Sequence, residues 1–275
     1  MPKIKEDKLL GPEYLQNLKK PKKGSRKGDN GKLLIIGGSE TYHGAPILSV
    51  MIASRIVDLV YFFSVKKNVE LAKKMKLKIR TFINPSEKEL EDYVEKVDAI
   101  LIGPGLEKSK NNEVMINWLL HEFKDKKFIL DAGAFDMIKP RLLNKNCILT
   151  PHTGEFKKFF GKEADKKNVK ALAKKHNCVI ALKGSTDLIA GPKEFMINKS
   201  GNPGMTKGGT GDILAGLIAG LACTNELFTA AAAGIFINGM AGDRLAKTRG
   251  TYYSAEDLLN EIPRTIKWCQ DLKLN

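Results

Sequence analysis

The chain has 275 residues, of which 43% are hydrophobic and 28% charged, and this hydrophobic content excludes a largely disordered protein. The 46 Lys and Arg residues outnumber the 31 Asp and Glu residues, so the formal net charge is +15 and the surface attracts anions. The four cysteines form no Cys-x-x-Cys pair, which argues against a zinc cluster or a disulfide framework and favours a reducing cytoplasm.

Residues 1–31 are rich in Lys, Gly and Pro and predict a basic extended arm with a short helix near 13–18, so we expect the ordered fold to start at Lys32. From there, apolar runs that read as strands alternate with helical patterns. The expected strands are 33–36, 60–64, 99–102, 128–130, 147–149 and 179–182. The expected helices are 46–57, 68–75, 153–160 and 166–176.

The last third of the chain predicts a hairpin at 187–197, two apolar helices at 213–223 and 228–246, and an amphipathic helix from Ser254. The Ser-x-x-Asp spacing from Ser254 to Asp257 fits a capping box. The alternation of strands and helices is typical of a mostly parallel sheet between two helical layers. Because no linker-like composition interrupts it, we expect residues 32–275 to form one domain.

A glycine-rich run, Gly208-Gly209-Thr210-Gly211-Asp212, directly precedes the first apolar helix. Glycines let backbone N–H groups converge, and the first helical turn adds a partial positive charge, so this point favours binding of a phosphate. A carboxylate there is suited to take a proton from a hydroxyl that attacks phosphorus. The structural alternative is a tight turn in which Asp212 only caps the helix.

Further loops rich in polar residues and glycine follow the predicted strands, at the sheet edge where open α/β folds bind ligands. The Walker A pattern and Gly-x-Gly-x-x-Gly are absent. His152 is either a ligand contact or an ordinary loop histidine, and the run from Lys183 is either a phosphate or ribose contact or a polar hairpin entry. The loops are Gly37-Gly38-Ser39, Gly103-Pro104-Gly105, the run 150–155 and the run 183–187.

From about Lys32 onward, these motifs resemble the ADP-dependent NAD(P)H-hydrate dehydratases, in the carbohydrate-kinase-like branch of the ribokinase-like superfamily. The most specific pieces are LTPHTGEF at 149–156, LKGST at 182–186 and GNPGM at 201–205, followed by GGTGD at 208–212. The resemblance implies an α/β, three-layer ribokinase-like fold with a mostly parallel central sheet. It also implies a lyase that dehydrates the S-form of hydrated NADH or NADPH, with ADP as co-substrate and AMP and phosphate as products.

The resemblance assigns Asp212 as the catalytic base that contacts the hydrate hydroxyl. It implies an anion hole at Gly208, Gly209, Thr210 and Gly211. It implies adenine-nucleotide contacts at Lys183, Gly184, Ser185, Thr186, Asp187 and Gly211. The hydrate pocket would be lined by Ala45, Gly105, His152 and Asp212. Mg²⁺ is expected to bridge the phosphates, and no side chain is assigned as a metal ligand.

Two positions depart from the family pattern: Lys207 stands where a small or hydroxyl residue is usual, and Pro46 replaces a small residue. The short arm leaves no room for the N-terminal epimerase domain of many relatives, so a separate NAD(P)H-hydrate epimerase is expected as a partner in the pathway. The family also implies a homo-oligomer, with a homotetramer expected.

Two alternatives stay open on the residues alone. One is a ribokinase-like kinase acting on a small molecule such as a vitamin precursor, because similar glycine loops occur there. The other is a basic nucleic-acid-binding protein, which the sparse aromatic content and the lack of a binding module disfavour. The sequence shows no signal segment or long apolar span, so we expect no membrane association.

Overall fold

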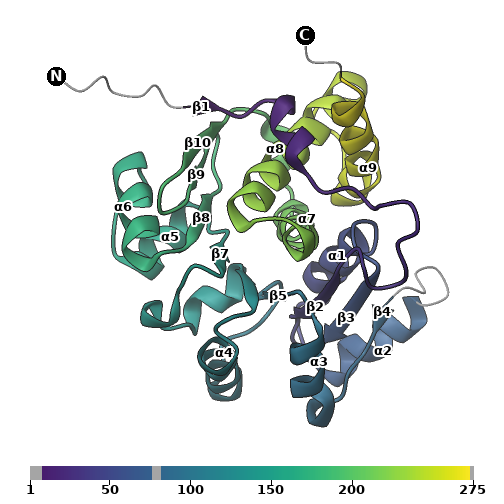
Figure 1. Cartoon of the computed structure of the whole chain (residues 1–275), viewed down its shortest axis with the longest axis vertical. Coiled ribbons are helices and arrows are strands. Elements are labelled where there is room, and N and C mark those ends of the chain that lie inside the picture. Colours follow the sequence, from purple (N-terminus) through teal and green to yellow (C-terminus); the bar gives the residue numbers. More distant parts are fainter. Residues whose placement is uncertain (1–7, 76–81, 273–275) are drawn as a thin grey trace.

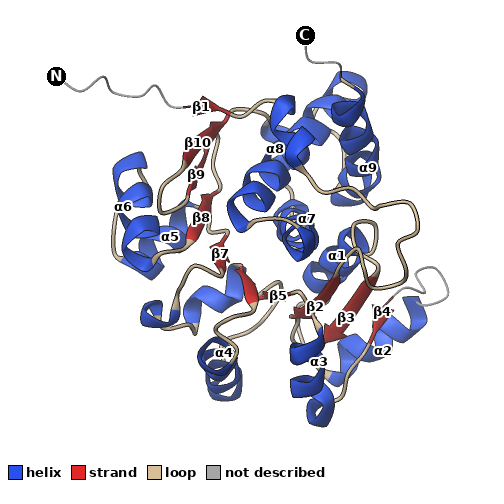
Figure 2. Ribbon diagram, viewed as in Figure 1, coloured by secondary structure: helices blue, strands red, loops and turns tan. Residues whose placement is uncertain are grey.

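The structure is a computed structural model that describes residues 8–75 and 82–272. Its described strands form one sheet in the order β1-β10-β9-β8-β7-β6-β5-β2-β3-β4. Figure 2 shows the strands as a twisted wall with helices on both sides. The described helices include none that is long and apolar enough to cross a membrane.

Seven neighbouring strands of this sheet run parallel, as the alternation of strands and helices predicts. They are β2 (Lys32–Ile36), β3 (Leu59–Phe63), β4 (Phe82–Ile83), β5 (Ala99–Ile102), β6 (Lys127–Leu130), β7 (Cys147–Leu149) and β8 (Val179–Leu182). The predicted hairpin is confirmed as antiparallel strands β9 (Asp187–Ala190) and β10 (Phe195–Asn198). β9 pairs antiparallel with β8, so the sheet is mixed.

Side chains of the central strands alternate between two buried clusters, one on each face of the sheet. Leu33 and Ile35 of β2 enter one cluster, and Leu34 and Ile36 enter the other. The first face is covered by α1 (Gly44–Ala53), α7 (Thr210–Thr224), α8 (Leu227–Arg249) and α9 (Ala255–Asp271) (Figure 1). The second is covered by α3 (Leu90–Lys96), α4 (Lys110–Glu122), α5 (Thr153–Phe160) and α6 (Lys166–His176). The predicted three-layer architecture is therefore confirmed.

The remaining helices are short or lie at the edge of the sheet. They are α2 (Lys66–Met75) and the 3-10 helices η1 (Pro12–Asn17), η2 (Glu87–Glu89), η3 (Ala132–Asp136), η4 (Pro140–Leu142) and η5 (Pro203–Thr206). α1 begins at Gly44 and ends at Ala53, whereas the sequence predicted 46–57. Pro46 lies in the first turn of α1, where its missing N–H costs no hydrogen bond.

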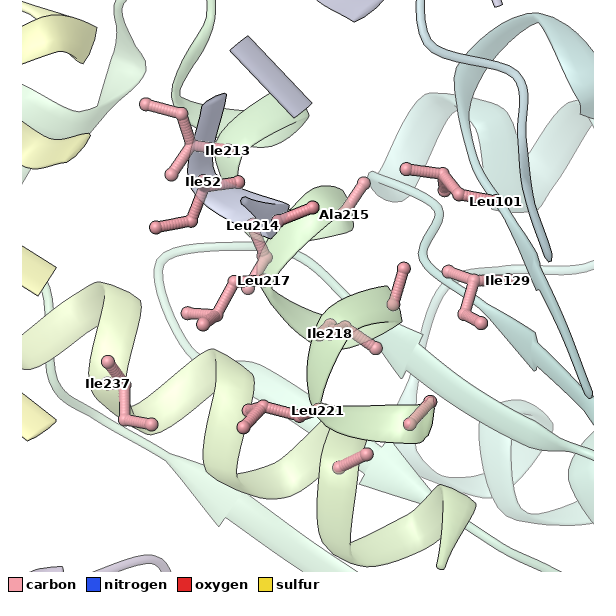
Figure 3. Packing of buried hydrophobic residues seen from close by; sticks show 14 of the residues in the cluster. Ile52, Leu101, Ile129, Ile213, Leu214, Ala215, Leu217, Ile218, Leu221 and Ile237 are labelled. Carbon is pink, nitrogen blue, oxygen red and sulfur yellow. The ribbon is translucent and has the colours of Figure 1, made fainter. Parts of the chain in front are cut away.

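Helix α7 packs between the sheet and the other helices of its layer. Figure 3 shows its apolar side chains between Ile52 of α1, Ile237 of α8 and the sheet residues Leu101 and Ile129. Small residues allow this close approach, because a Cβ atom built on Gly216 would lie 2.7 Å from both Ile52 Cγ2 and Ser49 O. The core therefore fixes where α7 begins.

The N-terminal segment is part of the fold, so the expectation that ordered structure starts at Lys32 is wrong. β1 (Lys8–Leu9) pairs parallel with β10, and η1 confirms the short helix predicted near 13–18. Leu15 is fully buried and Leu18 is 6% exposed, both in the cluster under α8 and α9. Two apolar side chains in a lysine-rich stretch are a weak sequence signal, yet they anchor the segment.

Candidate active site

The loops after the parallel strands come together at the carboxyl edge of the sheet, beside the first turn of α7. Gly38 N donates to Pro104 O (2.8 Å), which joins the loops after β2 and β5. The loops after β7 and β8 meet where His152 and Lys183 form an isolated parallel bridge. The loops that were predicted to border one cleft therefore lie together at one edge of the sheet.

Two buried side chains, Asp131 and Thr150, and the partly buried Lys183 are joined by hydrogen bonds at these strand ends. Asp131, at the end of β6, is 2% exposed, and its Oδ1 accepts hydrogen bonds from Lys183 Nζ (2.8 Å) and Thr150 Oγ1 (2.7 Å). Burial alone would lower the pKa of Lys183, but the nearby carboxylates, chiefly Asp131 and then Glu155, raise it on balance. Lys183 is thus a cation held in place at the carboxyl ends of β6, β7 and β8.

Asp212 lies in the first turn of α7, close enough to Asp131 and Lys183 for their charges to act on it. Its pKa is raised to about 6, first by burial and then by the negative charge of Asp131, against the opposing effect of Lys183. Burial likewise raises the pKa of Glu155. A carboxylate with a pKa near 6 is mostly ionised at neutral pH and is a better proton acceptor than an exposed aspartate.

The glycine run forms a loop in which three backbone amides, all of glycines, have no acceptor among the described residues. Gly209 has φ +94°, and a Cβ atom there would lie 2.5 Å from Leu48 Cδ1, so only glycine fits. Gly208, Gly209 and Gly211 N–H groups have no protein acceptor among the described residues. Thr210 is different, because its N–H donates to Lys207 O (3.4 Å) and its hydroxyl to Met205 O (2.7 Å). The amides available to an anion are therefore those of the three glycines.

Lys207 is directed toward the connection between α8 and α9. Its Nζ donates to Thr251 O and lies 5.2 Å from the ring centroid of Tyr253. The preceding loop is held by Asp243, whose carboxylate accepts from Gly201 N (2.9 Å) and Asn202 Nδ2 (3.1 Å). Lys207 thus ties the glycine loop to the connection between α8 and α9.

A cavity of about 430 Å³ extends from the start of α7 along α8. It is of the size typical of small-molecule sites. Of the predicted nucleotide residues, Thr186 does not line it. The residues that do line it are Lys183, Gly184, Ser185, Asp187 and Gly211, joined by Thr210 of the predicted anion hole.

Asp187 organises one wall of this cavity. Its Oδ1 accepts from Gly184 N (2.9 Å) and its Oδ2 from Asn198 Nδ2 (2.9 Å), while burial raises its pKa. These bonds close the turn between β8 and β9. The side chain therefore acts first as a support for the loop that begins at Lys183.

His152 caps the N-terminus of helix α5. Its Nδ1 accepts from Gly154 N (3.0 Å), and its backbone N–H donates to Glu155 Oε2 (2.8 Å), which completes a capping box. The other ring nitrogen, Nε2, lies 3.5 Å from Glu155 Oε1. His152 and Glu155 line a separate cavity of about 350 Å³.

Ala45 and Gly105 lie on the opposite side of the cleft and line neither of these cavities. The Ser49 hydroxyl lies near the carbonyl oxygens of both Ala45 (3.3 Å) and Asp212 (2.8 Å), which fixes the start of α1 beside the start of α7. A Cβ atom on Gly105 would lie 3.1 Å from Tyr42 Cβ. The structure therefore brings Ala45 close to Asp212, with Gly105 under Tyr42.

Sequence reasoning gave no role to Asp131, Ser49 or Asn238. Asp131 could have been found, because it follows a buried strand just as Lys183 does. Ser49 and Asn238 lie inside apolar helices, and only the packed structure shows what they face.

Among the described residues, no group of three or more His, Cys, Asp or Glu side chains is arranged to hold a metal ion. The cleft instead holds separate carboxylates, such as that of Asp212, beside the Lys183 cation and the glycine amides that have no protein acceptor. That chemistry fits a Mg²⁺ ion carried mainly by nucleotide phosphates, as is common for this metal.

The fold and the cleft define a member of the ribokinase-like superfamily. A ribokinase-like superfamily protein of Enterococcus faecalis superposes with a TM-score of 0.86 at 26% identity, covering 96% of each chain. The ADP/ATP-dependent NAD(P)H-hydrate dehydratase of Bacillus subtilis, co-crystallised with ATP and Mg²⁺, superposes with a TM-score of 0.81 at 26% identity. It covers 96% of this chain and 99% of that one.

The sequence model of the family described as NAD(P)H-hydrate dehydratase matches residues 33–264. The ADP-dependent (S)-NAD(P)H-hydrate dehydratase of Nitrosopumilus maritimus is 38% identical over 90% of this chain and 92% of its own length. The bifunctional NAD(P)H-hydrate repair enzyme of Methanocaldococcus jannaschii is 39% identical over 94% of this chain, which spans only 52% of that protein. The chain belongs to the NAD(P)H-hydrate dehydratase family, as its motifs predict.

Proposed function

We propose that this chain is an ADP-dependent (S)-NAD(P)H-hydrate dehydratase, a lyase that repairs hydrated NADH and NADPH. The observation that carries the proposal is Asp212, with its raised pKa, at the start of α7 beside the glycine amides and Lys183. Family membership supplies the identity of the hydroxyl that Asp212 faces. The vitamin-precursor kinase is less supported, because the similar curated relatives carry the dehydratase name.

The first step is transfer of the β-phosphoryl group of ADP to the hydrate. Asp212 takes the proton from the hydrate hydroxyl as its oxygen forms a bond to the β-phosphorus. The bond from that phosphorus to the bridging oxygen breaks, and AMP leaves. Gly208, Gly209 and Gly211 amides stabilise the charge on the transferring group, because they need no reorganisation to donate hydrogen bonds.

The second step restores the double bond of the nicotinamide ring. The bond from the ring carbon to the phosphorylated oxygen breaks, and inorganic phosphate leaves with the electron pair. The neighbouring ring carbon loses a proton, which the departing phosphate takes up. Lys183 is held by Asp131 and stays protonated, so it balances phosphate charge at the carboxyl edge of the sheet. A Mg²⁺ ion held by the phosphates would supply further charge neutralisation.

The nucleotide occupies the cavity of about 430 Å³. The hydrate is expected beside Asp212, between the loops that carry His152, Ala45 and Gly105. We propose residues 32–275 as the catalytic domain, with the N-terminal segment packed onto it. The homotetramer, the separate epimerase and the cytoplasmic location stay predictions.

The test is an assay with ADP, Mg²⁺ and the S-form of hydrated NADH, in which recovery of the reduced-nicotinamide absorbance is followed together with AMP release. Asp212→Ala is expected to abolish both signals while binding of ADP, measured by calorimetry, persists. Failure to restore the absorbance, together with phosphorylation of an unrelated alcohol, would identify a kinase instead. Retained activity in the variant would remove Asp212 from the base role.

A further inference from the structure

The cavity along α8 contains one buried side chain whose polar group is unused. Asn238 lies in the middle of α8, is only 4% exposed, and lines the cavity of about 430 Å³. Its Oδ1 is buried and has no hydrogen-bond partner. An unpaired buried amide destabilises a fold, so such a group in a cavity wall points to a ligand that completes it.

The other polar side chains around Asn238 are already paired within the protein. Ser200 Oγ donates to Asn198 Oδ1 (2.8 Å), and Asn202 accepts from Gly204 N (3.0 Å) and Tyr253 Oη (2.9 Å). Thr206 Oγ1 donates to Pro203 O (2.9 Å). These groups close the wall of the cavity and have bonds of their own, whereas the Asn238 Oδ1 has none.

The cavity has two chemically different ends. Lys183, Thr210 and Gly211 stand at the end near the glycine loop, where charge and free amides suit phosphates. Apolar Leu214 and Ile235 line the cavity with Asn238, which suits a flat base with one polar edge. Glycine at position 239 lets the loop that carries Ser200 pack directly against α8, because a Cβ atom at this position would lie 2.4 Å from Ser200 Oγ.

We propose that Asn238 is the residue that recognises the base of the nucleotide, by pairing with the 6-amino group and an adjacent ring nitrogen of adenine. Because Oδ1 has almost no accessible surface in the ligand-free protein, the amide must turn about its last side-chain bond when the base binds. It then offers an acceptor beside a donor, and adenine offers a donor beside an acceptor, so two parallel hydrogen bonds form. This inference rests on the proposed function for the presence of a nucleotide in the cavity. It adds which side chain makes the choice of base.

The test compares ADP with purine riboside 5′-diphosphate, which lacks the 6-amino group, by titration calorimetry. For the unmodified protein we expect ADP to bind about tenfold more tightly, the discrimination typical of one bidentate contact. In Asn238→Leu this ratio falls close to one, mainly through weaker ADP binding. The matched control is Ser185→Ala, in the exposed cavity wall, which changes both affinities together and keeps the ratio.

A structural role for Asn238 predicts a different readout. Because Asn238→Leu removes an unpaired polar group, the Tm of the ligand-free variant should equal or exceed that of the unmodified protein. If Asn238→Leu lowers the Tm, Asn238→Ala serves as the second variant, because alanine has no bulk to clash. Asn238→Ala must then still bring the ratio of the two affinities close to one. A preference for ADP that survives in both variants overturns the inference.

Failure of this inference is separable from failure of the proposed function. Dehydration that proceeds while both variants keep the preference for ADP overturns only the role of Asn238. A preference that depends on Asn238 without dehydration supports base recognition and overturns the dehydratase. No binding of ADP to the unmodified protein overturns both.

Discussion

Asp212 loses its proton at a higher pH than an exposed aspartate does. Its pKa is raised to about 6 by burial and by Asp131, and the mechanism uses the ionised form. We therefore expect kcat/KM to rise with pH up to about 6 and then level off on the alkaline side of that value. A pH profile with ADP and the hydrate measures this directly. An acid limb centred near pH 4 would assign the base to a more exposed carboxylate.

The same raised pKa makes Asp212 costly for stability. The folded state binds this proton more tightly than the unfolded chain, whose aspartate pKa is near 3.8, so protonation stabilises the fold. That stabilisation is complete below about pH 4 and is lost as the pH rises through 6. Asp212→Asn, which is inactive but neutral, should therefore have a higher Tm at pH 8.

The expected gain is a few degrees, because about 1 kcal/mol shifts the Tm of a chain this size by roughly 2–4 °C. Thermal unfolding at pH 8 and at pH 4 provides the comparison, since the two proteins should converge at the lower pH. A variant that is less stable at pH 8 would mean that Lys183 stabilises the carboxylate more than burial destabilises it.

At the scale of elements, the packing of α7 against α1 is set by glycine. A Cβ atom on Gly216 would lie 2.7 Å from backbone and side-chain atoms of α1, and neither helix can move without displacing Asp212. Gly216→Ala should lower the free energy of unfolding by about 1–3 kcal/mol, as overpacked cores do. Chemical denaturation measures the change.

Gly44→Ala is the matched control for this substitution. Gly44 lies in α1, and a Cβ atom built there meets nothing within 4 Å. Alanine should leave stability unchanged or raise it slightly, because it favours the helix. Equal losses in the two variants would show that space around α7 is not the limiting factor.

Sequence patterns predicted the elements whose apolar signal is strong. The buried strands β2, β5 and β8 are continuous apolar runs, and α7 and α8 are apolar almost throughout. Helices α3 and α4 were missed because polar and charged residues dominate them and few of their side chains are buried. β4 was missed because its two residues carry no periodic pattern.

The candidate site was predictable to a similar extent. Motifs at strand ends identified Asp212 and Lys183, because those residue types follow apolar runs or glycines. The contact of Lys183 with Asp131 joins positions 52 residues apart, and no local pattern encodes it. Likewise, the lack of a hydrogen-bond partner for Asn238 Oδ1 follows from how its neighbours pack, which the sequence does not show.

For the whole molecule, the N-terminal segment contributes to stability and not only to charge. Leu15 is fully buried under α8 and α9, so Leu15→Ala should cost about 2–5 kcal/mol in unfolding free energy. Leu9→Ala is the control, because Leu9 is 56% exposed and should change stability by less than about 0.5 kcal/mol. Denaturant titration of both variants measures the difference, and an unaffected Leu15→Ala would return the segment to the role of an unattached arm.

The pairing of β1 with β10 also bears on how copies of the chain behave at high concentration. β10 would otherwise present a row of unpaired backbone groups, and such rows are templates on which another chain can add a strand. In the described part of the chain, β1 covers that row with two residues, one of which is Lys8, so the edge seen there carries a charge. Displacement of β1 should therefore promote self-association through strands before the core of the molecule unfolds.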